Sequence, residues 1–122
     1  MTEEKCLCEP TEILIFPCSG GSNVGQIANE AAKELTTLNH GKMYCLAGIG
    51  GHVSGLIEST KVAKNLIAIN GCPVSCAKKT LEHAGFNPDV HVIVTHLGIK
   101  KNSSFTMNNS EIERVIKKVR SG

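Results

Sequence analysis

Short apolar runs alternate along the chain with segments of helical periodicity, which leaves few folds open to it. The run at residues 13–16, Ile-Leu-Ile-Phe, is wholly apolar, as expected of a strand buried on both faces of a parallel sheet. Apolar residues then recur at helical spacing from Val24 to about Asn39. The same alternation continues along the chain, with further strands predicted at residues 42–46, 66–69 and 90–95.

The segments between the predicted strands contain the start and stop signals of helices. Ser22 or Asn23 can cap the first helix, and Gly41 supplies a stop. Residues 53–64 have a weaker helical pattern, and a stronger one runs from residue 74 to a C-cap at Gly85. The last helix is predicted from a capping-box pattern, Ser-Glu-Ile-Glu, at residues 110–113.

Strands that alternate with helices predict an α/β fold with right-handed crossovers. We expect a small parallel sheet of about four strands with helices on both faces, a three-layer, Rossmann-like or flavodoxin-like arrangement in strand order 2-1-3-4. The length of 122 residues is enough to bury a real core. It suggests one α/β domain over residues 13–122, preceded by a loose lead-in at residues 1–12.

Composition narrows the classes of function. A net charge of +2 with interspersed Lys and Glu gives no broad basic face, and the absence of Trp leaves little to stack on bases, so nucleic-acid binding is not indicated. No apolar stretch is long enough to span a bilayer, and the polar, acidic start is unlike a signal peptide. We therefore expect a cytoplasmic protein, in which six cysteines indicate metal ligands or redox groups rather than disulfides.

Four of the cysteines are predicted to lie at the same edge of the sheet. Cys18, Cys45 and Cys72 each lie at or near the carboxyl end of a predicted strand. The expected strand order makes those three strands neighbours, about 4.8 Å apart. Cys76 would reach the same edge from the start of a helix. The four thiols are therefore predicted to converge.

The stretch at residues 70–79 places two of these thiols in a strand-to-helix turn. Cys72 and Cys76 are spaced Cys-x-x-x-Cys, and Pro73 suits a first helical turn. Backbone N–H groups at a helix start favour an anionic sulfur, and the thiolate is the form that binds metal or attacks an electrophile.

Four thiolates can close the tetrahedral coordination sphere of zinc. Cys18, Cys45, Cys72 and Cys76 are the predicted ligands. An iron–sulfur cluster needs the same thiolates, but nothing in the sequence resembles a ferredoxin-type cysteine run, so zinc is favoured. The roles of two other pairs stay open. Cys6 and Cys8 are solvated tail residues, extra ligands, a metal-delivery pair or a thiol pair that exchanges with the site. His52 and His96 are solvated or structurally bonded histidines, ligands or bases.

A thiol-based enzyme is the alternative. It would be a redox catalyst using Cys72 and Cys76, or an oxyanion-processing enzyme using Cys18 in a strand–loop–helix turn. Low-molecular-weight phosphatases and arsenate reductases place a cysteine in this way, but their loop closes with an arginine, whereas Val24 and Gly25 stand here. The glycine-rich residues 48–51 are interpreted as a tight turn, and the lysine pair at residues 100–101 as solvated charges.

Four motifs occur in order along the chain: Phe-Pro-Cys-Ser-Gly with Ser-Asn-Val-Gly at residues 16–25, Cys-Leu-Ala-Gly-Ile-Gly at 45–50, Gly-Cys-Pro with Cys-Ala-Lys-Lys-Thr-Leu-Glu at 71–82, and Leu-Gly-Ile-Lys-Lys at 97–101. Together they resemble the DGC-domain family of proposed zinc-binding proteins, over about residues 13–101. The resemblance implies four chelating cysteines, which match Cys18, Cys45, Cys72 and Cys76, and it supplies no established reaction. The family is named for an Asp-Gly-Cys triplet, where this chain has Asn70-Gly71-Cys72.

Overall fold

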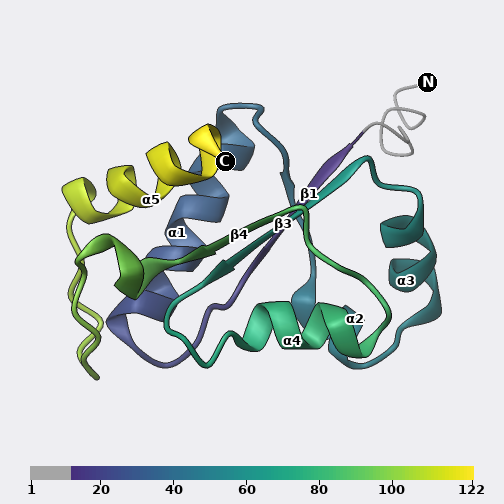
Figure 1. Ribbon diagram of the computed structural model, residues 1–122, viewed down its shortest axis with the longest axis horizontal. Coiled ribbons are helices and arrows are strands. Elements are labelled where there is room, and N and C mark those ends of the chain that lie inside the picture. Colours follow the sequence, from purple (N-terminus) through teal and green to yellow (C-terminus); the bar gives the residue numbers. More distant parts are fainter. Residues whose placement is uncertain (1–11) are drawn as a thin grey trace.

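A computed structural model describes residues 12–122, which form a four-stranded parallel sheet with helices on both faces (Figure 1). Cys6 and Cys8 lie outside the described residues. The elements in chain order are β1 (Ile13–Pro17), α1 (Asn23–Thr37), β2 (Lys42–Met43), α2 (Leu46–Gly50), α3 (Ser54–Lys61), β3 (Asn65–Asn70), α4 (Cys76–His83), β4 (Val90–Ile93), the 3-10 helix η2 (Val94–Leu97) and α5 (Asn109–Ser121).

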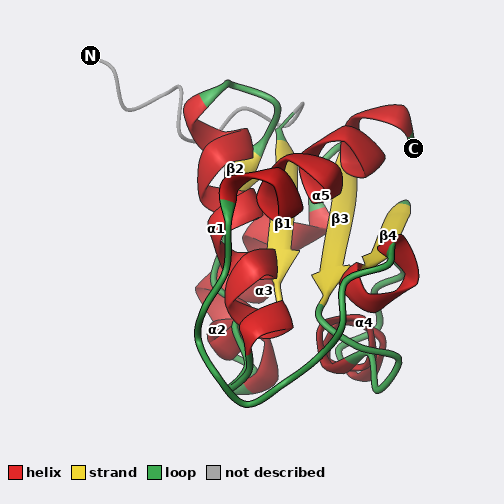
Figure 2. Cartoon of the chain, turned by 90° about the vertical axis from the view of Figure 1, so that its left-hand side faces the viewer, coloured by secondary structure: helices red, strands yellow, loops and turns green. Residues whose placement is uncertain are grey.

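The predicted strand order is confirmed: the sheet runs β2-β1-β3-β4, and every pairing is parallel. β1 is central and pairs along its whole length with β3, from Ile13 opposite Asn65 to Pro17 opposite Ile69. On its other side Ile15 pairs with Met43 of β2. Figure 2 shows β1 and β3 running in the same direction, so their carboxyl ends lie at one edge of the sheet.

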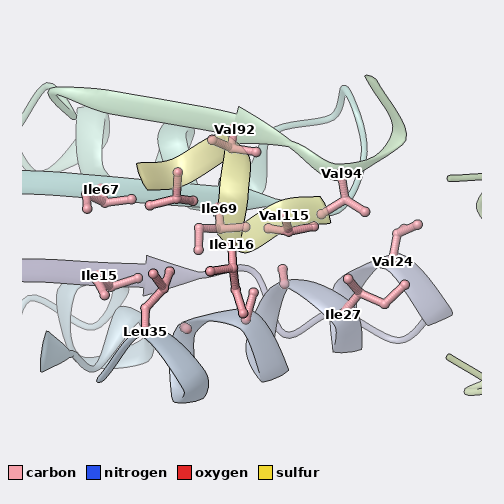
Figure 3. Close-up of a cluster of buried hydrophobic side chains, with 14 of the residues drawn as sticks. Ile15, Val24, Ile27, Leu35, Ile67, Ile69, Val92, Val94, Val115 and Ile116 are labelled. Carbon is pink, nitrogen blue, oxygen red and sulfur yellow. The ribbon is translucent and has the colours of Figure 1, made fainter. Parts of the chain in front are cut away.

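Two apolar layers hold the helices against the sheet. Alternate residues of a strand point to opposite faces, so Ile15 of β1 packs beneath α1 and α5, whereas Leu14 and Phe16 pack toward α2 and α4. The first layer is drawn in Figure 3, where Ile15, Ile67, Ile69 and Val92 of the sheet meet Leu35 of α1 and Val115 and Ile116 of α5. This confirms the expected three-layer arrangement.

The second strand is shorter than predicted, and the glycine-rich residues after it are helical. β2 has two residues, after which Cys45 becomes the N-cap of α2: its Sγ accepts a hydrogen bond from the Gly48 N–H at 3.3 Å. A side chain on Gly48 would collide with Leu56 of α3. The glycine therefore lets two short helices approach closely, and the interpretation of residues 48–51 as a tight turn was wrong.

Two other predicted boundaries also move. β4 ends at Ile93, and the chain continues as η2, whose Thr95 N–H donates to the Gly71 carbonyl at 3.1 Å. The capping box of α5 is two residues earlier than predicted, because Asn108 and Glu111 exchange the two capping hydrogen bonds. The cap of α1 is Ser22, as expected.

No helix within residues 12–122 has the length and apolar character needed to cross a membrane.

Candidate functional site

Three cysteines follow three neighbouring strands at the same edge of the sheet, as the sequence predicts. Cys18 comes directly after β1, and its N–H continues the ladder by donating to the Ile69 carbonyl at 2.9 Å. Cys72 lies in the turn after β3. Cys45 lies two residues beyond Met43 of β2. Because Met43 pairs with Ile15 of β1, the same register places Cys45 opposite Pro17. Cys76 is the first residue of α4.

Two adjoining cavities contain these thiols. Cys18, Cys72 and Cys76 line a cavity of about 230 Å³, which we call the thiol pocket. Cys45 lines a neighbouring cavity of about 520 Å³. Cys18 lines both, so it connects the two groups. Cys18 and Cys72 are half-buried, whereas Cys45 and Cys76 are exposed. The remaining lining residues of the thiol pocket are Gly20, Gly21, Ser22, Val24, Gly71, Val74 and Lys101.

The four cysteine side chains do not form a preformed metal site. Among residues 12–122, no three histidine, cysteine, aspartate or glutamate side chains lie close enough to hold a metal ion as they stand. Cys45 does not line the thiol pocket. His52 packs edge-on against His83, with 5.4 Å between ring centroids, and His96 lies in η2; neither histidine lines either cavity.

Backbone packing explains the glycines that surround the thiols. A Cβ on Gly25, in the first turn of α1, would lie 2.6 Å from both the nitrogen and the oxygen of Gly20 in the Cys18 loop. A Cβ on Gly71 would lie 2.9 Å from the Gly25 nitrogen. The start of α1 thus touches both cysteine turns through main-chain atoms. Side chains at these positions would force the turns apart.

Asn70 joins the Cys72–Cys76 turn to the edge strand. It is fully buried, and its Oδ1 accepts a hydrogen bond from the Ala77 N–H at 2.7 Å, which caps α4 from the end of β3. Pro73 therefore lies ahead of the helix rather than in its first turn, contrary to expectation, because Ser75 takes a left-handed conformation with φ of 58° before Cys76.

The Nδ2 of the same Asn70 side chain determines the protonation state of His91. With Oδ1 facing Ala77, Nδ2 faces the His91 Nε2 at 2.7 Å and can only donate, so that nitrogen must accept and the ring is neutral. Burial, followed by the positive charges of Lys78 and His96, lowers the pKa of His91 from its ordinary 6.5, against the opposing effect of Glu82. No role for His91 is predicted from the sequence, although His91 lies two residues from Ile93, the strand partner of Asn70.

The lowered pKa of His91 predicts a pH-dependent stability. The unfolded chain binds more protons than the folded one below the ordinary pKa of 6.5, so His91 contributes stability above that value and loses it as the pH falls. The free energy of unfolding in urea should decrease from pH 8 to pH 5.5, and His91→Gln, which keeps an acceptor but does not titrate, should flatten that decrease. An equal decrease in both proteins would contradict the assignment.

Lys101 is exposed, as predicted for a solvated charge, but it also makes a contact that the sequence does not predict. Its Nζ lies 3.5 Å from the Cys72 Sγ, and its side chain lines the thiol pocket. The sequence gives no signal for this contact, because Lys101 and Cys72 are brought together by a loop that follows η2 and carries no regular periodicity.

Comparison with known proteins now adds to this geometry. The family model for the DGC domain matches residues 14–119. The chain is 33% identical over 102 residues to a Pseudomonas aeruginosa protein named "Anaerobic and virulence modulator AnvM", covering 84% of this chain and 78% of that protein. No solved structure matches the chain. The match to the family model extends from β1 to α5 and includes all four cysteine positions, Cys18, Cys45, Cys72 and Cys76. The chain belongs to the DGC-domain family.

Proposed function

We propose that this protein binds one metal ion, zinc, through the thiolates of Cys18, Cys45, Cys72 and Cys76. The observation that supports the proposal most is the shared cavity: three of these thiols line the thiol pocket, and Cys18 also lines the cavity that contains Cys45. The role of the metal would be structural, metal-handling or sensing. A relative that is named as a modulator is in keeping with a sensing role.

The donor atoms support a thiophilic metal. Within the described part of the chain, no carboxylate or imidazole lines either of the two cavities, whereas thiols from four positions do. Soft thiolate ligands favour zinc, copper(I) or iron–sulfur clusters, while magnesium and calcium require oxygen ligands. A cytoplasmic location, where glutathione keeps thiols reduced, would leave the cysteines free to bind.

The four thiols must come closer to one another before a single ion can bind all of them. A zinc site made of four thiolates has four sulfurs at about 2.3 Å from the ion, arranged as a tetrahedron. Cys45 and Cys76 are exposed at the ends of their turns, so side-chain rotation is open to them, whereas Cys18 and Cys72 are half-buried and lie in turns fixed by main-chain packing. We expect the two half-buried thiolates to anchor the ion and the two exposed ones to close over it.

Elemental analysis with thiol counting tests the proposal. The full chain, purified under reducing conditions, should contain one zinc per chain and should leave two of its six cysteines open to alkylation. Chelation should open the other four. Absence of bound metal in freshly purified protein, or protection of fewer than four thiols, would contradict the four-thiolate site. Iron with inorganic sulfide would assign the same ligands to a cluster.

A thiol-based enzyme is the second candidate, and one observation favours it. The ammonium of Lys101 lies 3.5 Å from the Cys72 Sγ, where its positive charge would attract an anionic substrate to that thiol. In that case the same assay should give a metal-free protein in which a single cysteine reacts much faster than the others. The two candidates therefore predict opposite outcomes of one experiment.

A further inference from the structure

We infer that Lys101 is a positioning residue of the thiol pocket, which holds a positive charge beside Cys72 and gives this thiol a preference for anionic partners over neutral ones. The inference deepens the proposed function, because zinc with four thiolates carries a net negative charge that a fixed ammonium would offset. It is nevertheless a property of the metal-free chain and can be tested without any metal.

The contact between Lys101 and Cys72 joins residues that are far apart in the sequence. The distance from Nζ to Sγ is 3.5 Å, within the range of a hydrogen bond to sulfur. Among residues 12–122, Lys101 is the only charged residue that lines the thiol pocket. The other atoms that this part of the chain contributes to the lining belong to small, apolar or thiol side chains and to glycine backbone, so no carboxylate among them neutralises the ammonium.

Lys101 is held in place by the residues on either side of it. The side chain of Asn23, which is only 3% exposed, donates from Nδ2 to the Lys100 carbonyl at 2.8 Å and accepts at Oδ1 from the Asn102 N–H at 2.7 Å. The Asn23 N–H also donates to the Asn102 carbonyl at 3.2 Å. Ile99, buried in the core, anchors the same segment.

These bonds form a clamp between the start of α1 and residues 99–102. Since α1 also touches the Cys18 and Cys72 turns through Gly25, the clamp fixes the backbone of Lys101 relative to both turns. It also gives a physical reason for two sequence motifs that metal ligation leaves unexplained, Ser-Asn-Val-Gly at residues 22–25 and Leu-Gly-Ile-Lys-Lys at residues 97–101.

A pair of alkylating reagents tests the inference. Iodoacetate is anionic and iodoacetamide is neutral; in each reaction the thiolate sulfur forms a bond to carbon, the carbon–iodine bond breaks and iodide leaves. The ratio of the two rates at one cysteine cancels the intrinsic reactivity of that thiol and reports the local charge. The full chain is reduced, freed of metal with a chelator and labelled at low ionic strength, and each cysteine is followed by peptide mass spectrometry.

Lys101→Met should lower the iodoacetate-to-iodoacetamide ratio at Cys72 by about fivefold, the factor that two unit charges about 4 Å apart produce in water. Lys101→Arg should keep the ratio, and added salt should reduce the difference between wild type and Lys101→Met. Asn23→Ala should lower the ratio although the lysine is still present. Lys100→Met, which removes the adjacent exposed charge, is the matched control and should leave the ratio unchanged.

Cys45, which lies in the neighbouring cavity, supplies an internal control in every sample, and its ratio should be insensitive to Lys101. An unchanged ratio at Cys72 in Lys101→Met, or an equal fall in Lys100→Met, would overturn the inference. Because the labelled protein contains no metal, failure of this test leaves the zinc proposal standing, and a chain that binds no zinc can still pass it.

Discussion

Replacing Cys72 with serine should release the metal and lower the melting temperature together. A serine hydroxyl is a poor zinc ligand, and Cys72 is half-buried and lines the thiol pocket together with Cys18 and Cys76. Metal that binds only the folded state adds about 4 kcal/mol of stability at a free concentration a thousand times Kd. For a domain of this size we expect the melting temperature to fall by about 10 °C or more.

The measurement compares zinc content and thermal unfolding in wild type and Cys72→Ser, each with and without chelator. The chelator should lower the melting temperature of the wild type to that of the variant and have little effect on the variant, because binding energy is folding energy at such sites. The double variant Cys6→Ser/Cys8→Ser is the control and should keep its metal. A Cys72→Ser protein with unchanged zinc and unchanged melting would contradict the predicted ligand set.

Gly25→Ala should destabilise the fold, although alanine is normally the better helix residue. In the middle of an exposed helix the exchange gains up to about 1 kcal/mol. Here the new Cβ would lie 2.6 Å from backbone atoms of Gly20, which cannot rotate away as a side chain could. Overpacking of this kind costs about 1–3 kcal/mol, so the clash outweighs the helix propensity.

Urea unfolding of Gly25→Ala should therefore show a lower free energy of unfolding than wild type. Metal binding should weaken in parallel, because Gly20 and Cys18 belong to the same loop and a Cβ on Gly20 would already lie 3.2 Å from the Cys18 Sγ. Gly55→Ala in α3 is the matched control: nothing lies within 4 Å of its Cβ position, and it should be neutral or stabilising. A Gly25→Ala variant as stable as wild type would show that α1 can withdraw from the cysteine turns.

Much of the fold follows from local signals in the sequence. The fully apolar residues 13–16 are typical of a central parallel strand, and the alternation of strands with helices correctly predicts a parallel α/β sheet. The sequence does not determine the strand order, but the order taken as the commonest for a small doubly wound domain, β2-β1-β3-β4, is the one observed. That order alone puts the turns bearing Cys18, Cys45 and Cys72 at one edge. These predictions succeed because they depend on residue periods and on topology rather than on side-chain detail.

What the sequence did not reveal depends on contacts between distant segments. Residues 48–50 belong to α2, and the close approach of Gly48 to Leu56 of α3 is a contact that local propensity does not include. The pairing of Asn70 with His91 and of Lys101 with Cys72 joins residues more than twenty positions apart. The side-chain amide of Asn23, expected only as a cap, instead holds the segment that carries Lys101.

In the proposed site, one ion takes sulfur ligands from three separate turns and from the start of α4. X-ray absorption at the zinc edge, recorded on the full chain purified under reducing conditions, measures the number and kind of ligand atoms directly. The account predicts a shell of four sulfurs at about 2.3 Å, which shrinks when Cys72 is replaced by serine. A zinc shell made mainly of nitrogen and oxygen in the wild-type protein would contradict it.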